Sequence, residues 1–548
     1  MIPMRTATKS KKLAKAPYMR EETTMRVGRY GLYRDTRTFR CATFLALAMA
    51  GFFAVSAKAD DDMRSSPPDT TPYSRPLVPE DLALGRTAGP AGLAGRISFS
   101  VVDTVVNNTN PNLRFTDTFG DQETSIAVNP RHPNEIVITA FSGGWIGNGP
   151  CQLGTGNVNA PLWLSRNGGN TWTKEFTITP PVFTGSVPDV TGAPCDQTVD
   201  FGLSFNQLAG TFLTNSTNIY SAVTRNPMTT DAFHYSGFPG AATMTNLAAR
   251  NDEDQPQLLI GRRPGEIGVE NVYVAYDDFH TSPQTMRVAR APAVGVPEPD
   301  PPNFATDNSC GMGGVFVNPG LRLAIDPVTG VTYCAFQLAT APGATVNYML
   351  SQSTDGTTFG ASVLVAGPVT STQPTPKFCT VNALLGGVDH AAVDPQTGDV
   401  IYVYGALVGG VNQLFMKRVI NLVPGPAIPI TNGPVNAAIP SVAVAANGTI
   451  GVFYYTCERV PPASPFPLFR ANFAISTDGG ATFHMGIDLE DFLSPALDNG
   501  NPRQRVLGDY MQVKAVGNTF YGSFTGNGAP FGRTVSNTDP IFYRVSVR

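Results

Sequence analysis

Five short stretches of the sequence combine carboxylates with amide, imidazole, guanidinium or phenol groups. Each one directly precedes an alternating apolar run, which places it where a loop enters a strand. Carboxylates in such a setting can transfer protons, arginines can bind anions, and a phenol can act as a nucleophile. The stretches are GDQET (Asp121, Gln122, Glu123), PCDQT (Asp196, Gln197), RNDEDQP (Arg250, Asp252, Asp254, Gln255), VDH (Asp389, His390) and RQRVLGDY (Arg503, Arg505, Asp509, Tyr510).

A carboxylate at a strand entry can instead accept hydrogen bonds from backbone N–H groups of a neighbouring sheet. The recurrence of Asp in several stretches favours this tethering role, because catalytic residues are not usually repeated. Loops that follow the second strand of a hairpin add Trp145, Glu458 and Arg459 to the same face. Trp145 can stack on a sugar ring or simply fill its own loop, and the sequence leaves both interpretations open.

The elements that position these residues are repeated hairpins. An alternating strand ends in a turn and a second strand follows directly, with a mean spacing of about 64 residues between copies. This period is typical of a propeller or a linear array of sheets. The seven copies cover 124–141, 197–214, 256–278, 321–337, 390–406, 440–456 and 510–526.

The turns within these hairpins contain Pro and Gly at the positions that tight turns require. DPVTG (326–330) and DPQTG (394–398) place Pro where φ near −65° is required and Gly where φ must be positive. The chain holds 55 Gly and 47 Pro, whereas no long amphipathic helical pattern occurs. We therefore expect an all-β fold.

Three further stretches share one layout of Ser, an Asp or Asn, glycines and a Thr-aromatic pair. They are SRNGGNTW (165–172), STDGTTF (353–359) and STDGGATF (476–483), and their turn residues are Asn167, Asp355 and Asp478. The separations of 188 and 123 residues are multiples of about 62, which agrees with the hairpin period. In such a turn the carboxylate accepts N–H groups of its own loop and the aromatic residue is buried. We expect these three residues to be structural.

These motifs resemble the Asp box of the sialidase superfamily, also called the bacterial neuraminidase repeat, and the resemblance covers residues 97–548. It implies a single β-propeller, for which the hairpins predict seven blades, with the family's six as the alternative. It also implies that the Asp-box turns lie on the rim away from the active site. The family's F-R-I-P signature is not present, since GRIS (95–98) differs from it.

The resemblance further implies a glycoside hydrolase that acts on terminal sugars. A tyrosine nucleophile would be helped by a glutamate, an aspartate would be the acid/base, and arginines would bind the substrate carboxylate. The alternatives are a non-catalytic propeller that binds glycan or protein, or another hydrolase or lyase on the same scaffold. The candidate catalytic residues are Tyr510, Asp509, Asp254 and Glu123, and the candidate substrate-binding residues are Arg250, Arg459, Arg505 and Trp145.

The two ends of the repeat region predict how the ring closes. The last hairpin is followed by one more apolar stretch, 541–547, and lacks a fourth strand. Residues 97–106, ISFSVVDTVV, form a β-rich stretch that has no partner in the first repeat. Because unpaired edges are costly, we expect 97–106 to pair with 541–547 as the outer strand of the final blade.

The N-terminal region has the layout of a signal peptide. A basic segment, the apolar run 42–55 and AKA at 57–59 follow each other in order, which predicts cleavage after residue 59 and a secreted or periplasmic protein. Residues 60–96 are rich in Pro, Ser and Gly and read as a disordered linker. No later apolar run approaches the roughly 18 residues of a membrane span.

Removal of residues 1–59 changes the charge and the cysteine count. It leaves 26 of 38 basic and 39 of 42 acidic residues, a net charge of −13, which disfavours nucleic acid as a partner. Six of seven cysteines remain, a number compatible with disulfides. We expect Cys151–Cys195 and Cys310–Cys379 pairs, because each pair occupies loops of one face. No cofactor is expected, although 252–255 and 277–278 offer carboxylates that suit Ca²⁺.

Overall fold

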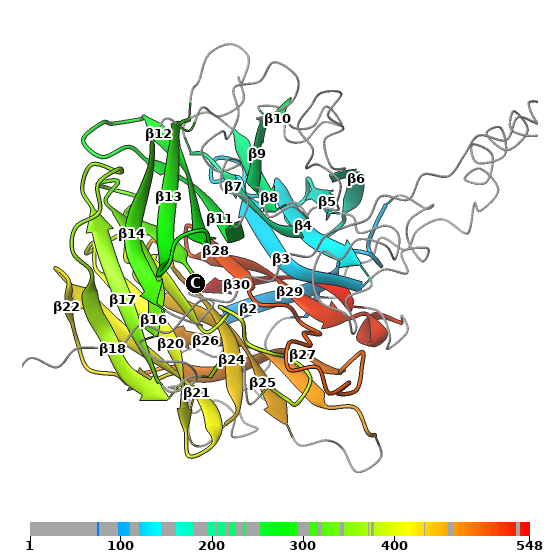
Figure 1. The fold of residues 1–548 in the computed structure, drawn as a ribbon. Helices are drawn as coiled ribbons and strands as arrows, with labels where there is room; N and C mark the ends of the chain where they lie inside the picture. Colours follow the sequence, from blue (N-terminus) through cyan, green and yellow to red (C-terminus); the bar gives the residue numbers. More distant parts are fainter. Residues whose placement is uncertain are drawn as a thin grey trace, which may run out of the picture. The chain divides into compact units, whose positions relative to one another are not determined.

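The computed structural model describes residues 74–75, 97–109, 120–143, 160–178, 195–203, 207–213, 219–224, 234–235, 253–293, 304, 306–314, 320–339, 345–370, 372–373, 377–431, 433, 435–458, 464–532 and 538–547. The chain divides into two compact units, Met1–Met63 and Arg64–Arg548. Every described residue belongs to the second unit, and all of its regular elements except one 3₁₀ turn are β-strands (Figure 1).

All seven predicted hairpins are present as antiparallel strand pairs. In each of the first two sheets, consecutive strands lie side by side. The first sheet consists of β3 (Gly120–Val128), β4 (Ile136–Gly143), β5 (Ala160–Ser165) and β6 (Thr173–Ile178), and the second of β7 (Cys195–Phe201), β8 (Leu208–Leu213), β9 (Ile219–Thr224) and β10 (His234–Tyr235).

An eight-stranded sheet follows, made of two four-stranded halves. The halves are joined by one parallel pair of residues, Gly314 in β14 and Ala339 in β16. The first half is β11 (Glu253–Arg262), β12 (Glu270–Asp278), β13 (Gln284–Pro292) and β14 (Thr306–Gly314), and the second is β15 (Arg322–Ile325), β16 (Thr332–Ala339), β17 (Thr345–Ser353) and β18 (Val363–Thr370).

Three sheets complete the described part of the chain. Their strands are β19 (Asp389–Val393), β20 (Val400–Val408), β21 (Val411–Ile420), β22 (Val423–Pro424) and β23 (Ile428–Pro429); β24 (Ala437–Val444), β25 (Ile450–Glu458), β26 (Leu468–Ser476) and β27 (His484–Leu493); and β28 (Gln512–Val516), β29 (Thr519–Asn527), β30 (Thr538–Val547), β2 (Ile97–Asp103) and β1 (Ser74–Arg75). The 3₁₀ turn η1 spans Ala529–Phe531.

The first strand of each hairpin contacts the first strand of the next, and the last contacts the first. The succession is β3, β7, β11, β15, β19, β24, β28 and again β3. A closed succession of antiparallel sheets around inner strands is the arrangement of a β-propeller. Counted by hydrogen bonding, however, the described strands form six sheets, so the seven predicted blades are not seven separate sheets.

The second strands of the hairpins carry the core. All nine residues of β12 are buried, as are the first seven of β20, because both faces of these strands pack against neighbouring sheets. Aromatic rings join the last two sheets: Phe453 of β25 lies 5.5 Å from Phe524 and 5.6 Å from Tyr543, measured between ring centroids. Such contacts add to the burial of apolar area that holds the sheets together.

The final sheet joins segments that lie far apart in the sequence. β2 pairs antiparallel with β30, from Ile97 opposite Val547 to Asp103 opposite Ile541, and Figure 1 shows the blue β2 beside the red β30. The predicted pairing of the N-terminal strand with the last strand is therefore confirmed. The short β1 pairs with β2 in turn, so β2 is not the outer strand that we expected.

The disulfides differ from the prediction. Cys310 bonds to Cys334, and Cys379 bonds to Cys457, with Cα–Cα distances of 6.3 and 5.6 Å. The predicted Cys310–Cys379 pair is wrong, because Cys310 lies in β14, near the strand β16 that carries Cys334, and not in a loop. The predicted Cys151–Cys195 pair lies outside the described side chains.

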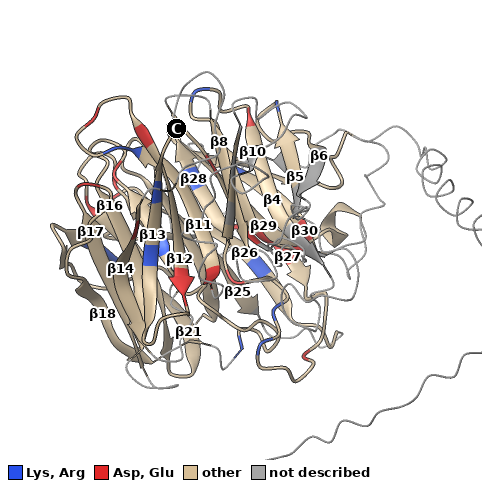
Figure 2. Cartoon of the chain, turned by 45° about the horizontal axis from the view of Figure 1, so that its top comes forward, with Lys and Arg blue, Asp and Glu red and all other residues tan. Residues whose placement is uncertain are grey.

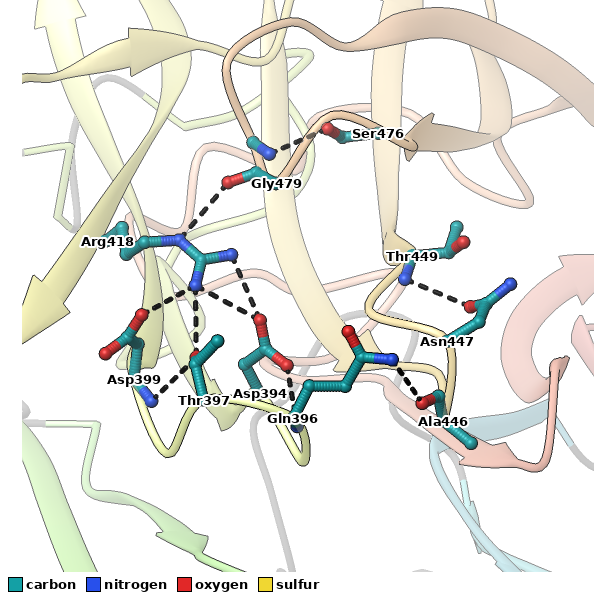
Figure 3. A network of polar contacts seen from close by, with 11 residues as sticks. Asp394, Gln396, Thr397, Asp399, Arg418, Ala446, Asn447, Thr449, Ser476 and Gly479 are labelled. Carbon is teal, nitrogen blue, oxygen red and sulfur yellow. Dashed lines mark hydrogen bonds and ion pairs between the residues drawn. The ribbon is translucent and has the colours of Figure 1, made fainter.

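Arg418 links two turns on the face where the inner strands end (Figure 3). Its guanidinium donates to Asp394 at 3.1 Å and to Asp399 at 2.8 Å, both in the β19–β20 turn. Its Nε donates to the carbonyl of Gly479 at 3.2 Å, in the turn that joins β26 to β27. One side chain thus fastens neighbouring sheets to each other, and its two carboxylate partners neutralise its charge.

We predict that Arg418→Met lowers the free energy of unfolding by about 1–3 kcal/mol, because Asp394 and the Gly479 carbonyl lose their charged donor. The matched control is Arg503→Met, since Arg503 is exposed. Denaturant unfolding should place that control within about 0.5 kcal/mol of the wild type. Equal effects of the two substitutions would contradict the structural role of Arg418.

Deletion of residues 97–103 should lower the stability by several kcal/mol, because Phe99, Val101 and Val102 are buried and β30 would lose its partner. Deletion of residues 60–73 is the control and should change the melting temperature little. Both variants are compared by thermal melts of protein that starts at residue 60. If the two deletions melt alike, β2 does not close the final sheet.

Candidate functional site at the strand entries

A belt of side chains runs around the inner strands. We define the belt as one residue per inner strand, each paired with a residue of the second strand of its hairpin. Five belt residues accept a backbone N–H from the next inner strand, at 2.6–3.4 Å. The belt positions are Ser125, Thr198, Gln257, Arg322, His390, Ser441 and Gln512.

Two positions depart from this pattern. Gln512 accepts the hydroxyl of Ser125 at 2.8 Å and no backbone N–H. Arg322 has no acceptor atom in its side chain, so it cannot take part in the same way. Its guanidinium donates to the carbonyl of the preceding residue, Leu321, at 2.8 Å.

A β-bulge precedes the belt in four of the inner strands. The register shifts between the flanking residues, and one residue of each bulge adopts a positive φ of 47–55°. Such a conformation is costly for residues other than glycine, and bulges often redirect side chains next to a functional site. The four left-handed residues are Glu123, Asp196, Gln255 and Ile439.

The bulges bring three carboxyl groups from three sheets together. The Asp196 side chain hydrogen-bonds both Glu123 and Asp254, so the three carboxyls form a chain that must share protons. Burial is the main cause that raises the pKa of each, and it brings the pKa of Asp254 to about 8. Glu123 is fully buried, whereas Asp254 keeps partial exposure. Asp254 is therefore the member of the chain that a ligand from solvent can reach.

Arg505 supplies the positive charge of this cluster. It forms an ion pair with Asp509, and its Nη1 lies 3.8 Å from Oε1 of Glu123. The same Glu123 oxygen accepts the backbone N–H of Asp509 at 2.9 Å. The Arg505 charge opposes the effect of burial on the pKa of Glu123, so Glu123 is easier to ionise than burial alone would allow.

Asp509 is fully engaged by its surroundings. Besides Arg505, its carboxylate accepts the Gln255 amide at 3.3 Å and the backbone N–H of Leu385 at 3.4 Å. It therefore has the tethering role that the sequence offered as the alternative to catalysis.

Tyr510 lies between the carboxyl chain and the inside of the ring. It is buried, and its hydroxyl has no hydrogen-bond partner among the described residues. Burial, followed by the charges of Asp196 and Glu123, raises its pKa well above the usual range, so the phenol keeps its proton. The guanidinium carbon of Arg322 lies 5.1 Å from the centre of the Tyr510 ring.

The structure thus brings five of the candidate residues together: Glu123, Asp254, Arg505, Asp509 and Tyr510. Arg250, Arg459 and Trp145 lie outside the described residues, so the predicted arginine clamp is not described as a whole. The sequence placed Asp196 at a strand entry but not among the candidate catalytic residues, and Arg322 was not singled out at all. Asp196 occupies the same left-handed bulge position as Glu123. Arg322 would have been found only by aligning it with the belt position of Ser125.

The Asn167, Asp355 and Asp478 turns lie between the third and fourth strands of their sheets. Oδ1 of each residue accepts a backbone N–H of its own turn, at 2.9 Å from Thr171, 2.8 Å from Thr357 and 3.0 Å from Thr482. Trp172, the aromatic residue of the first turn, is fully buried and packs on Phe542 with a centroid distance of 5.2 Å. These side chains hold loops and do not contribute to the carboxyl cluster.

Charged residues are sparse along the strands, and most of the ribbon in Figure 2 is neither acidic nor basic. Within the described ranges, no group of three or more His, Cys, Asp or Glu side chains has an arrangement that would hold a metal ion. Of the proposed Ca²⁺ ligands, Asp252 is not described. A membrane-spanning helix was also not found in the part of the chain that the structure describes.

Comparisons with known proteins give distant likenesses only. No protein-family model matches the chain, and no curated protein matches it. A protein of unknown function from Dyadobacter fermentans is 12% identical, with a TM-score of 0.38, over 79% of this chain and 96% of that one. An α-L-arabinofuranosidase from Fusarium graminearum is 10% identical, with a TM-score of 0.38, over 79% and 94%. A Trypanosoma rangeli sialidase is 11% identical, with a TM-score of 0.35, over 62% and 53%. Likenesses at this level do not assign a function.

The raised pKa of Asp254 makes a prediction about stability. Because the folded protein holds this proton up to about pH 8 and the unfolded chain releases it near pH 4, stability falls as the pH rises between these values. Asp254→Asn removes this dependence, so the variant should gain stability relative to the wild type from pH 5 to pH 8, measured by thermal melts.

Asp478→Asn is the matched control. The hydrogen bonds of its turn outweigh desolvation and lower the pKa of Asp478 to about 2, so its contribution is lost only as the pH falls below about 4. Its effect on stability should be constant from pH 5 to pH 8. A constant effect of Asp254→Asn over the same range would show that Asp254 is ionised throughout.

Proposed function

We propose that the chain is an exported, sialidase-like glycoside hydrolase that acts on terminal sugars of glycans. The observation that carries the proposal is the chain of three carboxyls, Glu123, Asp196 and Asp254, which shares protons next to Arg505 and Tyr510. Glycoside hydrolysis needs one carboxyl that is protonated and one group that attacks or activates the attacker. A chain of carboxyls with a cation at one end supplies both a protonated carboxyl and an ionised one.

The charges next to the three carboxyls decide which one donates a proton and which one accepts it. Arg505 favours ionisation of Glu123, whereas Asp254, at the far end and with a pKa of about 8, keeps its proton. Asp254 would donate this proton to the glycosidic oxygen as the bond to the sugar breaks. Glu123 would accept the phenol proton while the Tyr510 oxygen attacks the anomeric carbon. Water would then release the sugar, with Asp254 as the base that takes the proton of the water and Tyr510 regaining its own proton.

Sialic acid is the first substrate to test, because the resemblance of the Asp-box motifs predicts it. Arg505 is already paired with Asp509 and close to Glu123, so it is less available to bind a substrate carboxylate than the prediction assumed. The substrate panel should therefore include neutral glycosides, among them α-L-arabinofuranosides, beside the sialosides.

Three further proposals concern the architecture and export. We propose seven blades, supported by the seven belt positions and by the single residue pair that joins the halves of the eight-stranded sheet. We propose that residues 1–59 are a cleaved signal and that residues 60–96 are a linker before a propeller of residues 97–548. Two disulfides support an oxidising compartment. N-terminal sequencing of the exported protein tests the cleavage site.

The competing function is a non-catalytic propeller that binds glycan or protein. Glu123 accepts the Asp509 N–H and lies close to Arg505, which is the behaviour of a tethering carboxylate. If calorimetric titration shows that the protein binds glycans and it hydrolyses none of them, this function is favoured.

Fluorogenic glycosides test the hydrolase directly. Asp254→Asn should lower kcat by about 10²–10⁴-fold, because the proton donor is lost, and Tyr510→Phe should remove turnover. Wild-type kcat should fall above about pH 8, where Asp254 ionises. The control is Asp498→Asn, an exposed carboxylate paired with Lys377, which should leave kcat unchanged. Absence of wild-type turnover on the whole panel would reject the proposal.

A further inference from the structure

A narrow cavity lies in the ring at the level of the belt. Its volume is about 10 Å³, and its lining includes Arg322, Tyr510, His390, Gln257 and Gln512. A cavity of this size holds roughly one particle as large as a water molecule. A sugar or a peptide side chain is too large for it, so only a water molecule or a small ion fits.

Arg322 brings a permanent positive charge to this cavity. Its side chain is 3% exposed, and no carboxylate of the described residues lies within ion-pair distance of it. Nη1 donates to the Leu321 carbonyl, whereas Nη2 has no partner among the described residues. A buried, unpaired guanidinium is costly, and arginine cannot escape this cost by losing its proton.

Two carboxyls that feel the charge of Arg322, Asp277 and Asp389, form no ion pair with it. The oxygens of Asp389 accept the Gln337 amide at 2.8 Å and the Tyr402 hydroxyl at 2.6 Å. Burial is the main cause that raises the pKa of Asp277 well above its usual range, which favours its uncharged form. Among the described residues, Arg322 therefore has no carboxylate within ion-pair distance.

The other polar groups around the cavity are left with donors. Oε1 of Gln257 accepts the Leu323 N–H at 2.6 Å, and Oε1 of Gln512 accepts the Ser125 hydroxyl, so only their amide N–H groups remain. Nδ1 of His390 accepts the Val442 N–H at 3.4 Å, which puts the ring proton on Nε2. Burial lowers the pKa of His390 to about 3, so the ring is neutral. The hydrogen bonds of the belt thus use the acceptor atoms of these three side chains, and their N–H donors remain for a ligand in the cavity.

We propose that a small monovalent inorganic anion, chloride in a physiological medium, binds in this cavity between Arg322 and Tyr510. Arg322 supplies the counter-charge, and the Tyr510 hydroxyl supplies a donor that has no other partner in the described residues. The anion neutralises the buried guanidinium at the belt position that cannot accept an N–H. The anion therefore gives Arg322 a partner at the one belt position whose side chain has no acceptor atom. This site does not depend on whether the protein is a hydrolase.

The test measures the thermal stability of the whole protein in chloride-free buffer at constant ionic strength. Sodium methanesulfonate, whose anion is larger than the cavity, is replaced stepwise by sodium chloride or bromide. The wild type should show a saturable rise in melting temperature of about 1–3 °C. Arg322→Gln should remove the response, and Arg544→Gln, which alters a half-buried arginine that donates to the Gly168 carbonyl, should keep it.

Two further measurements keep the proposal falsifiable if Arg322→Gln does not fold. Tyr510→Phe should weaken the apparent halide affinity several-fold, and crystals soaked in bromide should show an anomalous peak next to Arg322. The proposal is overturned if the melting temperature does not respond to halide, if bromide binds elsewhere only, or if sialic acid stabilises the protein and halide does not. None of these readouts depends on glycosidase activity, so they separate this site from the proposed function.

Discussion

The structure depends on how the free edge of each inner strand is satisfied. An inner strand pairs with its own sheet on one side only, so its other backbone N–H groups face the next sheet and need acceptors. The belt supplies them through side chains, as in Thr198 with Leu258 and Ser441 with Val513. Each acceptor joins two consecutive sheets, so the inner strands are held in register with one another. The side chains that precede the belt in these strands, among them the carboxyl cluster, are held in place as well.

This constraint explains why the carboxyl cluster sits where it does. The segments that precede the belt residues need not bond to the next inner strand. In these segments, bulges at Glu123, Asp196 and Gln255 change the direction of the side chains. The bulges bring carboxyls from three sheets into contact in an environment with little water, where burial raises their pKa values. The same strained residues therefore fix the geometry of the cluster and set its protonation. A belt that holds the strands rigidly is what allows this strain to persist.

The sequence predicted local features well and long-range features unevenly. Hairpins and turns depend on Pro, Gly and alternating residues that are close in the chain, and all seven predicted hairpins formed. The pairing of β2 with β30 was predictable because both had an unsatisfied edge. The Cys310 pairing was not, because disulfide geometry depends on which strands become neighbours across a sheet. Arg322 was overlooked, and Asp196 was named without a catalytic role, because the importance of both residues comes from their neighbours in space.

The closure of the final sheet by β2 also governs the order in which the protein folds. Hairpins such as β19–β20 join residues close in sequence, whereas β2 and β30 are more than 400 residues apart, so their encounter carries a much larger loss of chain entropy. The hairpins can form while the chain is still incomplete, but β2 must wait until β30 has been synthesised. Until then β2 remains an unpaired, apolar edge that other chains can capture. In the reverse direction, release of β2 frees the edge of β30, which exposes a second strand to pairing with other chains.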